Sequence, residues 1–263
     1  MGGTELKMFS PEILARFTRR QAALVHLGVS ALIAATIVTL MLLLWYPSPY
    51  FEAAGGSTLL MLLIGVDVIL GPLLTFIVFN PGKKSLIYDL AVIVMLQVAA
   101  LAYGVNVMAS ARPAFVVYLR GVFEVVAANN VVTEGMAEAR LPEFQSVPLT
   151  GPQLAAARIP IDPGLQLQIS MESAAGGPDF TAYPRFYIPY STAAREAAAR
   201  GEPLAILAQK NSASAEAVAK LVNASGKSVE GLVFLPLRTR TGAMTIVLDK
   251  FDGVVIGVLR VIP

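Results

Sequence analysis

Few residues in this chain could carry out covalent chemistry. Cysteine is absent and His26 is the only histidine, so thiolate chemistry and a multi-histidine metal site within one chain are excluded. The sequence has no phosphate-binding glycine loop, esterase elbow or metalloprotease motif. Glu134, Glu138 and Glu143 resemble paired carboxylates, but their loop-like surroundings are typical of a solvated surface. We therefore expect no enzyme activity, no metal and no cofactor.

The polar residue with the most unusual surroundings is Asp67, which lies in the middle of an apolar stretch. A carboxylate at that depth of a bilayer costs about 2.5–3.5 kcal/mol. Gly71 and Thr75 follow at successive helical turns, Pro72 removes a backbone donor, and Gln97 is polar within another apolar stretch. One interpretation is that these five residues form a docking site for a partner helix. The other is an Asp67–Gln97 hydrogen bond that only holds the chain's own helices together.

The composition indicates that these residues lie in a membrane. The 263 residues are 56% hydrophobic and only 14% charged, whereas soluble domains are about 25% charged. Three stretches are long enough to cross a bilayer as helices, namely residues 22–46, 57–79 and 89–108. We expect a three-helix transmembrane region over residues 22–110 and a water-facing domain over residues 111–263.

Basic residues predict the orientation of these helices. Four of them flank the first helix on its N-terminal side, none lies in the first loop, and two lie in the second loop: Lys7, Arg16, Arg19, Arg20, Lys83 and Lys84. The positive-inside rule then places the N-terminus in the cytoplasm and the C-terminal domain outside the membrane, which is the periplasm in a Gram-negative cell.

Two further features fit this topology. Trp45 and Tyr46 are expected in an interfacial aromatic belt at the outer side. Residues 1–21 are expected to form an amphipathic lead-in on the cytoplasmic leaflet. The net charge of only +2 argues against nucleic acid as a partner.

The C-terminal region is predicted to be an α+β domain with an antiparallel sheet. Its expected strands are residues 114–120, 122–128, 232–238, 243–249 and 254–262. Its expected helices are residues 191–200, a short helix from Glu202, and residues 212–223. Residues 153–158 are predicted to form a helical turn, and residues 165–169 a strand fragment or an amphipathic stretch.

Three segments carry a resemblance to a known family: YPSPYFEAAGG, GVDVILGPLLTFIVFNPGKKSLIYDLAVIVMLQVAALAYG and ARPAFVVYLRGVFEVV. The chain resembles the TfpX/TfpZ family of type IV pilin accessory proteins. The residues that match the family pattern are Asp67, Gly71, Pro72, Pro81, Lys83, Asp89 and Gln97. The resemblance implies a non-enzymatic inner-membrane factor that acts on a cognate major pilin, with the pilus assembly machinery as a further partner.

A membrane-anchored sensor with a periplasmic ligand-binding domain is the alternative. A sensor needs an output on the cytoplasmic side, where the predicted topology leaves only the N-terminal flank and one short loop. A partner would therefore have to supply the output.

Overall fold

The computed structural model describes residues 16–263. It contains two compact units. The helix unit comprises residues up to Met41 and Ser57–Met108, and the α+β unit comprises Leu42–Gly56 and Ala109–Pro263. Most of the amphipathic lead-in expected over residues 1–21 lies outside the described residues.

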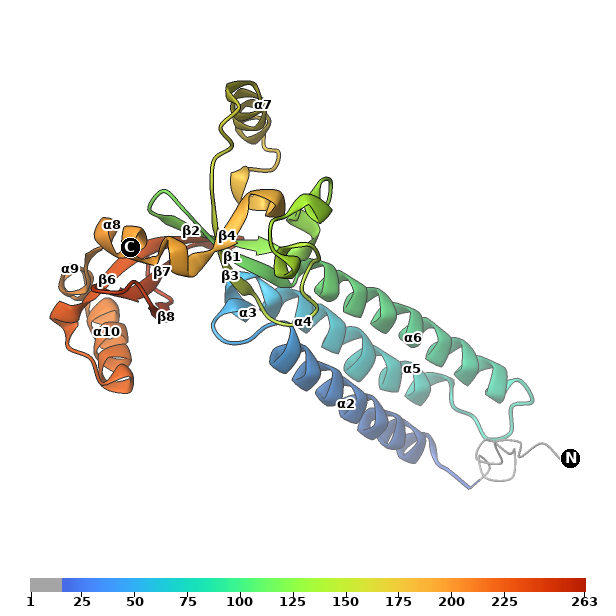
Figure 1. Ribbon diagram of the computed structural model, residues 1–263. Coiled ribbons are helices and arrows are strands. Elements are labelled where there is room, and N and C mark those ends of the chain that lie inside the picture. The colour runs from blue at the N-terminus through green and yellow to red at the C-terminus, as the bar shows by residue number, and fades with distance from the viewer. Residues whose placement is uncertain (1–15) are drawn as a thin grey trace, which may run out of the picture. The chain divides into compact units, whose positions relative to one another are not determined.

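Two long apolar helices dominate the helix unit (Figure 1), α2 (Arg19–Leu44) and α6 (Leu86–Ala111). Each has 26 residues, which corresponds to about 39 Å of helix and exceeds a bilayer core of about 30 Å. α2 begins after a capping box, in which Thr18 Oγ1 accepts from the Gln21 N–H and Gln21 Oε1 accepts from the Thr18 N–H. The first and third predicted apolar helices are therefore present.

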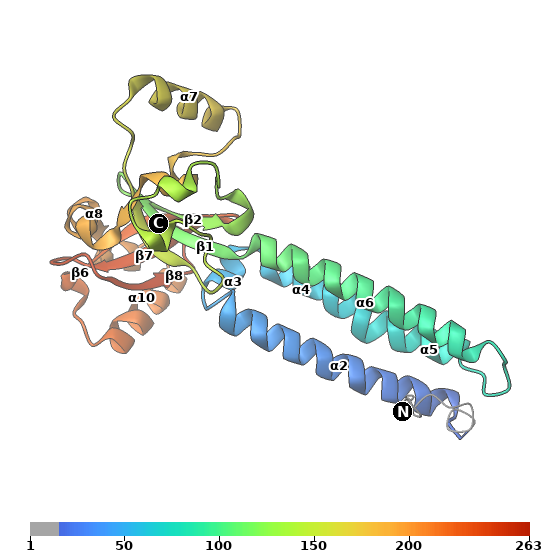
Figure 2. The same cartoon turned by 45° about the vertical axis from the view of Figure 1, so that its right-hand side comes forward.

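The second predicted apolar helix is interrupted. It consists of α4 (Gly56–Ile64), a π-helical segment η2 (Gly65–Leu70) and α5 (Gly71–Val78), and these run beside α6 in both views (Figures 1 and 2). Within the described residues, two helices rather than three are long and apolar enough by themselves to cross a membrane. The interruption ends two residues before Pro72, which cannot continue the hydrogen-bond ladder because it lacks a backbone N–H.

The α+β unit is built on one eight-stranded sheet, whose path runs β4-β3-β1-β2-β6-β7-β8 with β5 paired to β6. Its strands are β1 (Pro113–Leu119), β2 (Val122–Ala127), β3 (Gln153–Ala157), β4 (Tyr187–Pro189), β5 (Glu202–Pro203), β6 (Leu232–Thr239), β7 (Gly242–Asp249) and β8 (Val255–Leu259). β1 and β2 form a hairpin through Arg120 and Gly121, both at positive φ, as a tight primed turn requires.

The prediction of a purely antiparallel sheet is wrong. β1 is parallel to β3, and β2 is parallel to β6, although consecutive strands such as β6 and β7 are antiparallel. Tight turns fix an antiparallel direction only for strands that follow one another directly. β3 and β6 follow long connections. One returns the chain to the end of the sheet where β1 starts, and the other returns it to the end where β2 starts.

Both faces of the sheet are covered. Along β1, Val116 and Tyr118 pack into one buried cluster, whereas Phe115 and Val117 pack into another on the opposite face. In the second cluster the ring of Phe115 packs against Phe144 and Tyr187, with ring centroids 6.3 and 5.1 Å away. A central strand that is buried on both faces explains its continuous apolar sequence.

Short helices surround the sheet, namely α3 (Tyr50–Ala53), α7 (Pro163–Ala174), α8 (Ala194–Arg200), α9 (Leu204–Ala208) and α10 (Ser212–Ser225). α8, α9 and α10 gather around β6–β8 (Figures 1 and 2). The irregular connections contain 3-10 turns: η3 (Ala128–Asn130), η4 (Met136–Glu138), η5 (Pro142–Phe144), η6 (Phe180–Ala182), η7 (Pro184–Phe186), η8 (Tyr190–Thr192) and η9 (Val229–Gly231).

The prediction for residues 153–158 is wrong, and so is the strand alternative for residues 165–169. Residues 153–158 were expected as a helical turn but contain strand β3, which pairs with both β1 and β4. Residues 165–169 alternate like a strand but lie in α7, whose N-cap Asp162 accepts from the Gly164 N–H. Pairing decides the first case, whereas the cap and Pro163 at the first turn decide the second.

The connection between α2 and α4 is built into the α+β unit. Tyr46 is 1% exposed and Ala53 is fully buried, and Ala53 belongs to the same cluster as Val116 and Tyr118. Leu44 O accepts a 2.7 Å hydrogen bond from the Gly151 N–H. Residues 42–56 are therefore part of the domain core and not a free loop.

Candidate functional site

A hydrogen bond from Gln97 organises the interrupted helix. Gln97 Nε2 donates to the backbone carbonyl of Asp67 over 3.0 Å. In a π-helical segment each N–H donates to the carbonyl five residues earlier. The Gly71 N–H follows this pattern and donates to Val66 O, so the next carbonyl in the series is Asp67 O. Its donor would be the N–H that Pro72 lacks. Gln97 thus supplies the hydrogen bond that the proline removes.

Gly71 makes this approach of Gln97 possible. A Cβ at residue 71 would lie 2.0 Å from Gln97 Nε2 and 2.5 Å from Gln97 Cδ. Only a residue without a side chain leaves room there. The glycine therefore provides a small-residue notch, and a side chain of α6 already fills it.

The carboxylate of Asp67 takes no part in this bond. Asp67 is 6% exposed, and its Oδ1 has no hydrogen-bond partner among the described residues. An unpaired acceptor buried in an apolar environment is costly. The Asp67–Gln97 contact expected from the sequence is present, but it uses the backbone carbonyl and leaves the carboxylate Oδ1 buried without a partner.

Thr75 is held by the histidine of the neighbouring helix. His26 Nδ1 and Thr75 Oγ1 are 2.6 Å apart, and the tautomer decides which of the two atoms donates. This pair is not among the sequence-based predictions. His26 lies near the start of the first apolar segment and Thr75 near the end of the second, and a chain that turns back on itself brings these two positions together. That placement was a signal for the pair.

The structure thus brings Asp67, Gly71, Pro72, Thr75 and Gln97 onto one interrupted helix and its neighbours. Gly71, Pro72 and Thr75 are all buried. Within the described residues, the side chains of Gln97 and Thr75 have partners in the same unit, whereas Asp67 Oδ1 has none. Asp67 is therefore the member of this set that offers a free polar atom.

The residues used to predict topology occupy chain ends and connections. Arg16, Arg19 and Arg20 are exposed at the start of α2. Lys83 forms a 2.5 Å ion pair with Asp89, and Lys84 is exposed. Trp45 and Tyr46 both fall in the α+β unit, where the Tyr46 ring packs edge-on against Phe51 at 5.9 Å.

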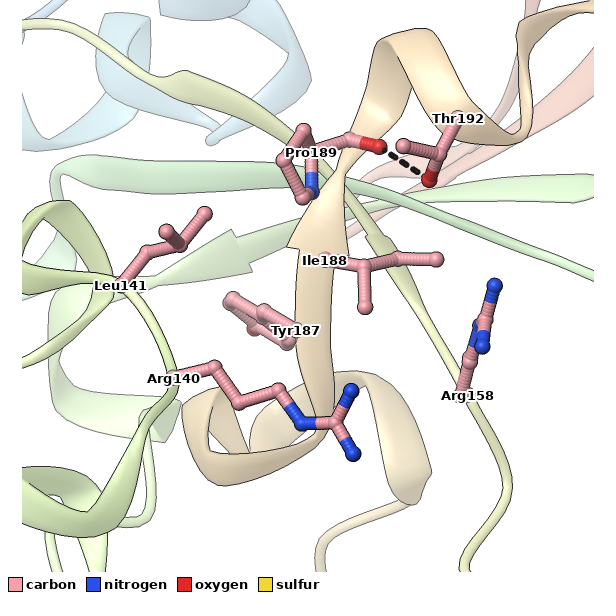
Figure 3. A pocket seen from close by; sticks show the side chains of 7 residues that line it. All are labelled: Arg140, Leu141, Arg158, Tyr187, Ile188, Pro189 and Thr192. Carbon is pink, nitrogen blue, oxygen red and sulfur yellow. Dashed lines mark hydrogen bonds between the residues drawn. The ribbon is translucent and has the colours of Figure 1, made fainter.

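The α+β unit has a hollow of about 290 Å³ beside its edge strand β4. Figure 3 shows Arg140 reaching from its loop across β4, with Arg158 on the opposite side of that strand. The rest of the lining comes from Leu141, Tyr187, Ile188, Pro189 and Thr192. The sequence interpretation missed this hollow, because its residues come from segments that only the pairing of β3 with β4 unites.

No metal centre accompanies either feature in the described part of the chain, where no three histidine, aspartate or glutamate side chains are placed to hold an ion. The described groups can bind through hydrogen bonds and charge.

Comparison with known proteins identifies relatives among fimbrial assembly proteins. The family model of the fimbrial assembly protein FimB matches residues 16–55. The fimbrial assembly protein of serogroup I from Dichelobacter nodosus is 31% identical over 230 residues, which cover 86% of this chain and 89% of that protein. The chain belongs to the fimbrial assembly protein family. The family match spans α2 and most of the segment 42–56.

Two other relatives in the same family extend this result. The serogroup E1 protein of D. nodosus is 30% identical over 230 residues, again 86% of this chain and 89% of the relative. The protein of serogroups C1 and C2 is 34% identical over 117 residues, which are 44% of this chain and 89% of that relative. No solved structure matches the chain.

Proposed function

We propose that this chain is an inner-membrane accessory protein of type IV pili, of the TfpX/TfpZ kind, that binds its cognate pilin and promotes pilus assembly. It acts as a chaperone or assembly factor without covalent chemistry. Membership of the fimbrial assembly family supports the pathway. The observation that supports a binding mechanism is the unpartnered carboxylate of Asp67 within an apolar helix.

The proposal includes a topology with three membrane crossings. α2 and α6 are each long enough to span a bilayer, and α4, η2 and α5 together run from Gly56 to Val78, within the range of about 17–25 residues that a crossing needs. The charge distribution around α2 and at Lys83 and Lys84 supports a cytoplasmic N-terminus. The α+β unit then lies in the periplasm.

In this arrangement the pilin is bound at two places. Its apolar helix approaches η2 and offers a hydrogen-bond donor to Asp67, and its head is bound by the α+β unit. An interhelical hydrogen bond in a membrane contributes about 1–2 kcal/mol. Two linked contacts raise the affinity through effective concentration, so neither contact has to be strong alone.

Photocrosslinking in the native membrane tests the helix contact. A photoreactive residue is placed at Ile69, which is 61% exposed on η2, and the matched control is Met95, which is 63% exposed on α6. We expect a crosslink to the pilin from position 69 only. Asp67→Ala should weaken it about fivefold or more, as expected for the loss of at least 1 kcal/mol, whereas Asp67→Asn, which keeps an acceptor oxygen, should retain part of it.

Crosslinks that stay within this chain would contradict pilin binding at η2. A deletion strain provides the physiological test, since it should carry fewer surface pili while pilin transcription is unchanged. Normal piliation in that strain would refute the proposed function.

A further inference from the structure

The arginine hollow, defined by the seven lining residues of Figure 3, has an unbalanced charge. Arg140 and Arg158 are both exposed, and the described residues give neither guanidinium an ion-pair partner. No acidic residue lines the hollow. Two guanidinium groups at a hollow without a counter-charge favour an anionic ligand.

The hollow is held in shape by the core beneath it. Tyr187 is buried, packs against Phe115 and Phe144, and donates its hydroxyl to Thr181 O. Burial raises the pKa of the Tyr187 hydroxyl, so this hydroxyl stays neutral and does not compete for the arginines.

Hydrogen bonds hold the backbone at or next to both arginines. Gln145 Nε2 donates to Ala139 O over 3.0 Å, directly before Arg140, and the Arg158 N–H donates to Phe186 O over 3.0 Å. The two arginines therefore project from ordered backbone.

A second hollow beside the first carries the opposite charge. It has a volume of about 530 Å³, shares Pro189 with the arginine hollow, and includes Glu143 and Asp252 in its lining. An anion is therefore directed toward the side of Pro189 where the arginines lie.

Pro189 also lacks a backbone N–H, so the edge strand β4 is a poor template for adding another strand.

We propose that the arginine hollow binds a carboxylate on the head of the fimbrial subunit, together with a neighbouring apolar side chain of the same polypeptide. The identity of this partner rests on the proposed function, whereas the preference for a carboxylate rests on the hollow alone. Arginine pairs with a carboxylate through two parallel hydrogen bonds. Leu141, Ile188 and Pro189 offer apolar contact to the adjacent side chain.

The apolar lining distinguishes this ligand from free phosphate. Phosphate is compact, multiply charged and strongly hydrated, and it gains nothing from the apolar surface that it would cover. A carboxylate flanked by an apolar group uses both parts of the hollow. N-acetyl-leucine carries this pair of groups, and its amide carries the apolar group without the charge.

Ligand-observed NMR on the full chain in lipid nanodiscs tests the assignment with these probes. We expect N-acetyl-leucine to bind with a Kd of about 1–10 mM, in keeping with the small size of the probe. It should bind at least about tenfold more tightly than N-acetyl-leucine amide, as charge-assisted hydrogen bonds predict. The double variant Arg140→Gln, Arg158→Gln should abolish this difference, while Arg238→Gln, an exposed arginine on β6, should leave it intact.

Each other outcome overturns a defined part of the proposal. Equal binding of acid and amide would remove the role of the arginines, and equal binding of inorganic phosphate would make the hollow a general anion site. Absence of binding by all three probes would refute the site.

Crosslinking separates this proposal from the proposed function. In cells carrying the double variant, a probe at Thr192, which lines the hollow, should lose its crosslink to the subunit while the Ile69 probe keeps at least part of its own. If neither probe reaches the subunit in the wild type but N-acetyl-leucine still binds through the arginines, the proposed function fails and the carboxylate site stands.

Discussion

The two units use apolar residues in opposite ways. The helix unit exposes large apolar side chains such as Leu32 and Met95, whereas the α+β unit buries many of its apolar residues in clusters around the sheet. Burial from water stabilises the second unit. The first lacks that driving force if lipid surrounds it, so packing and hydrogen bonds must position its helices.

This difference changes what a glycine or a polar side chain does in each unit. In the helix unit, Gly71 and Gln97 compensate for a missing backbone donor. In the α+β unit, Gly253 lets a turn lie against a helix, and Tyr190 Oη donates to Gly253 O over 2.7 Å. Substitutions at these positions can therefore separate the stabilities of the two units.

The largest expected effect is that of Gly253→Ala on the α+β unit. Residue 253 has φ of +74°, and an added Cβ would lie 1.9 Å from Ala194 O, so we expect a loss of about 3 kcal/mol or more. Gly176→Ala is the control, because residue 176 has φ of +88° but no atom within 4 Å of the added Cβ. It should lose only about 1–2 kcal/mol.

Intrinsic fluorescence measures this effect. Trp45 is the only tryptophan of the chain and belongs to the α+β unit, so its unfolding curve reports on that unit. Equal losses in the two alanine variants would mean that the turn moves away from α8 at little cost.

Gly71→Ala should have the next largest effect, and it should be confined to the helix unit. The Cβ displaces Gln97 and leaves Asp67 O without its donor, a loss of about 1–3 kcal/mol. Because the chain contains no cysteine, a single cysteine at Ile93, buried on α6, reports helix separation through its maleimide labelling rate. Labelling should accelerate several-fold.

The matched control is Gly65→Ala, where an added Cβ meets no atom within 4 Å. Its labelling rate should stay close to that of the parent. A change in Trp45 fluorescence unfolding in the Gly71 variant would contradict the independence of the two units.

Acid should destabilise the α+β unit through Asp249. The Lys227 ammonium donates a hydrogen bond to the Asp249 carboxylate, and so does the Phe251 N–H. Both bonds hold the pKa of Asp249 below its usual 3.8. The stabilisation is present above the unfolded-state pKa and is lost as the pH falls through the folded-state pKa. Asp249→Asn should therefore flatten the acid limb of a Tm–pH profile.

The control for this titration is Glu216→Gln, which removes an exposed carboxylate of α10. Its acid limb should match that of the parent. An unchanged limb in the Asp249 variant would assign the acid sensitivity to other carboxylates.

The smallest expected effect concerns the ion pair between Glu52 and Arg260, whose nearest atoms are 2.8 Å apart. Both side chains are exposed, so Glu52→Gln should change the stability by less than about 1 kcal/mol. Unfolding measured at low and high salt should show the small difference vanish at high salt. A larger loss would mean that charge, rather than burial of Ala53, holds the segment 42–56.

Local patterns in the sequence were sufficient where neighbours along the chain decide the structure. Such patterns predicted the strands on either side of Gly121, the helices α8 and α10, and the consecutive strands β6, β7 and β8. They were insufficient for β3, whose Gln–Leu–Ala–Ala–Ala sequence favours a helix and becomes a strand through pairing with β1 and β4.

The candidate sites follow the same division. Asp67 and Gln97 were recognisable, because a polar residue in an apolar segment needs a partner. The π-helical segment was not, since the sequence shows Pro72 but not the register in which the ladder continues. Arg140 and Arg158 look like ordinary surface charges in the sequence, and only β4 unites them.

The segment 42–56 has a consequence for exchanging parts between relatives. A chimaera joined at residue 109 would combine the sheet of one protein with the buried Tyr46 and Ala53 of another. Such a hybrid would be mismatched in its own interior. A successful exchange transfers residues 42–56 and 109–263 together, so any property of the α+β unit is inherited as two separate stretches of the gene.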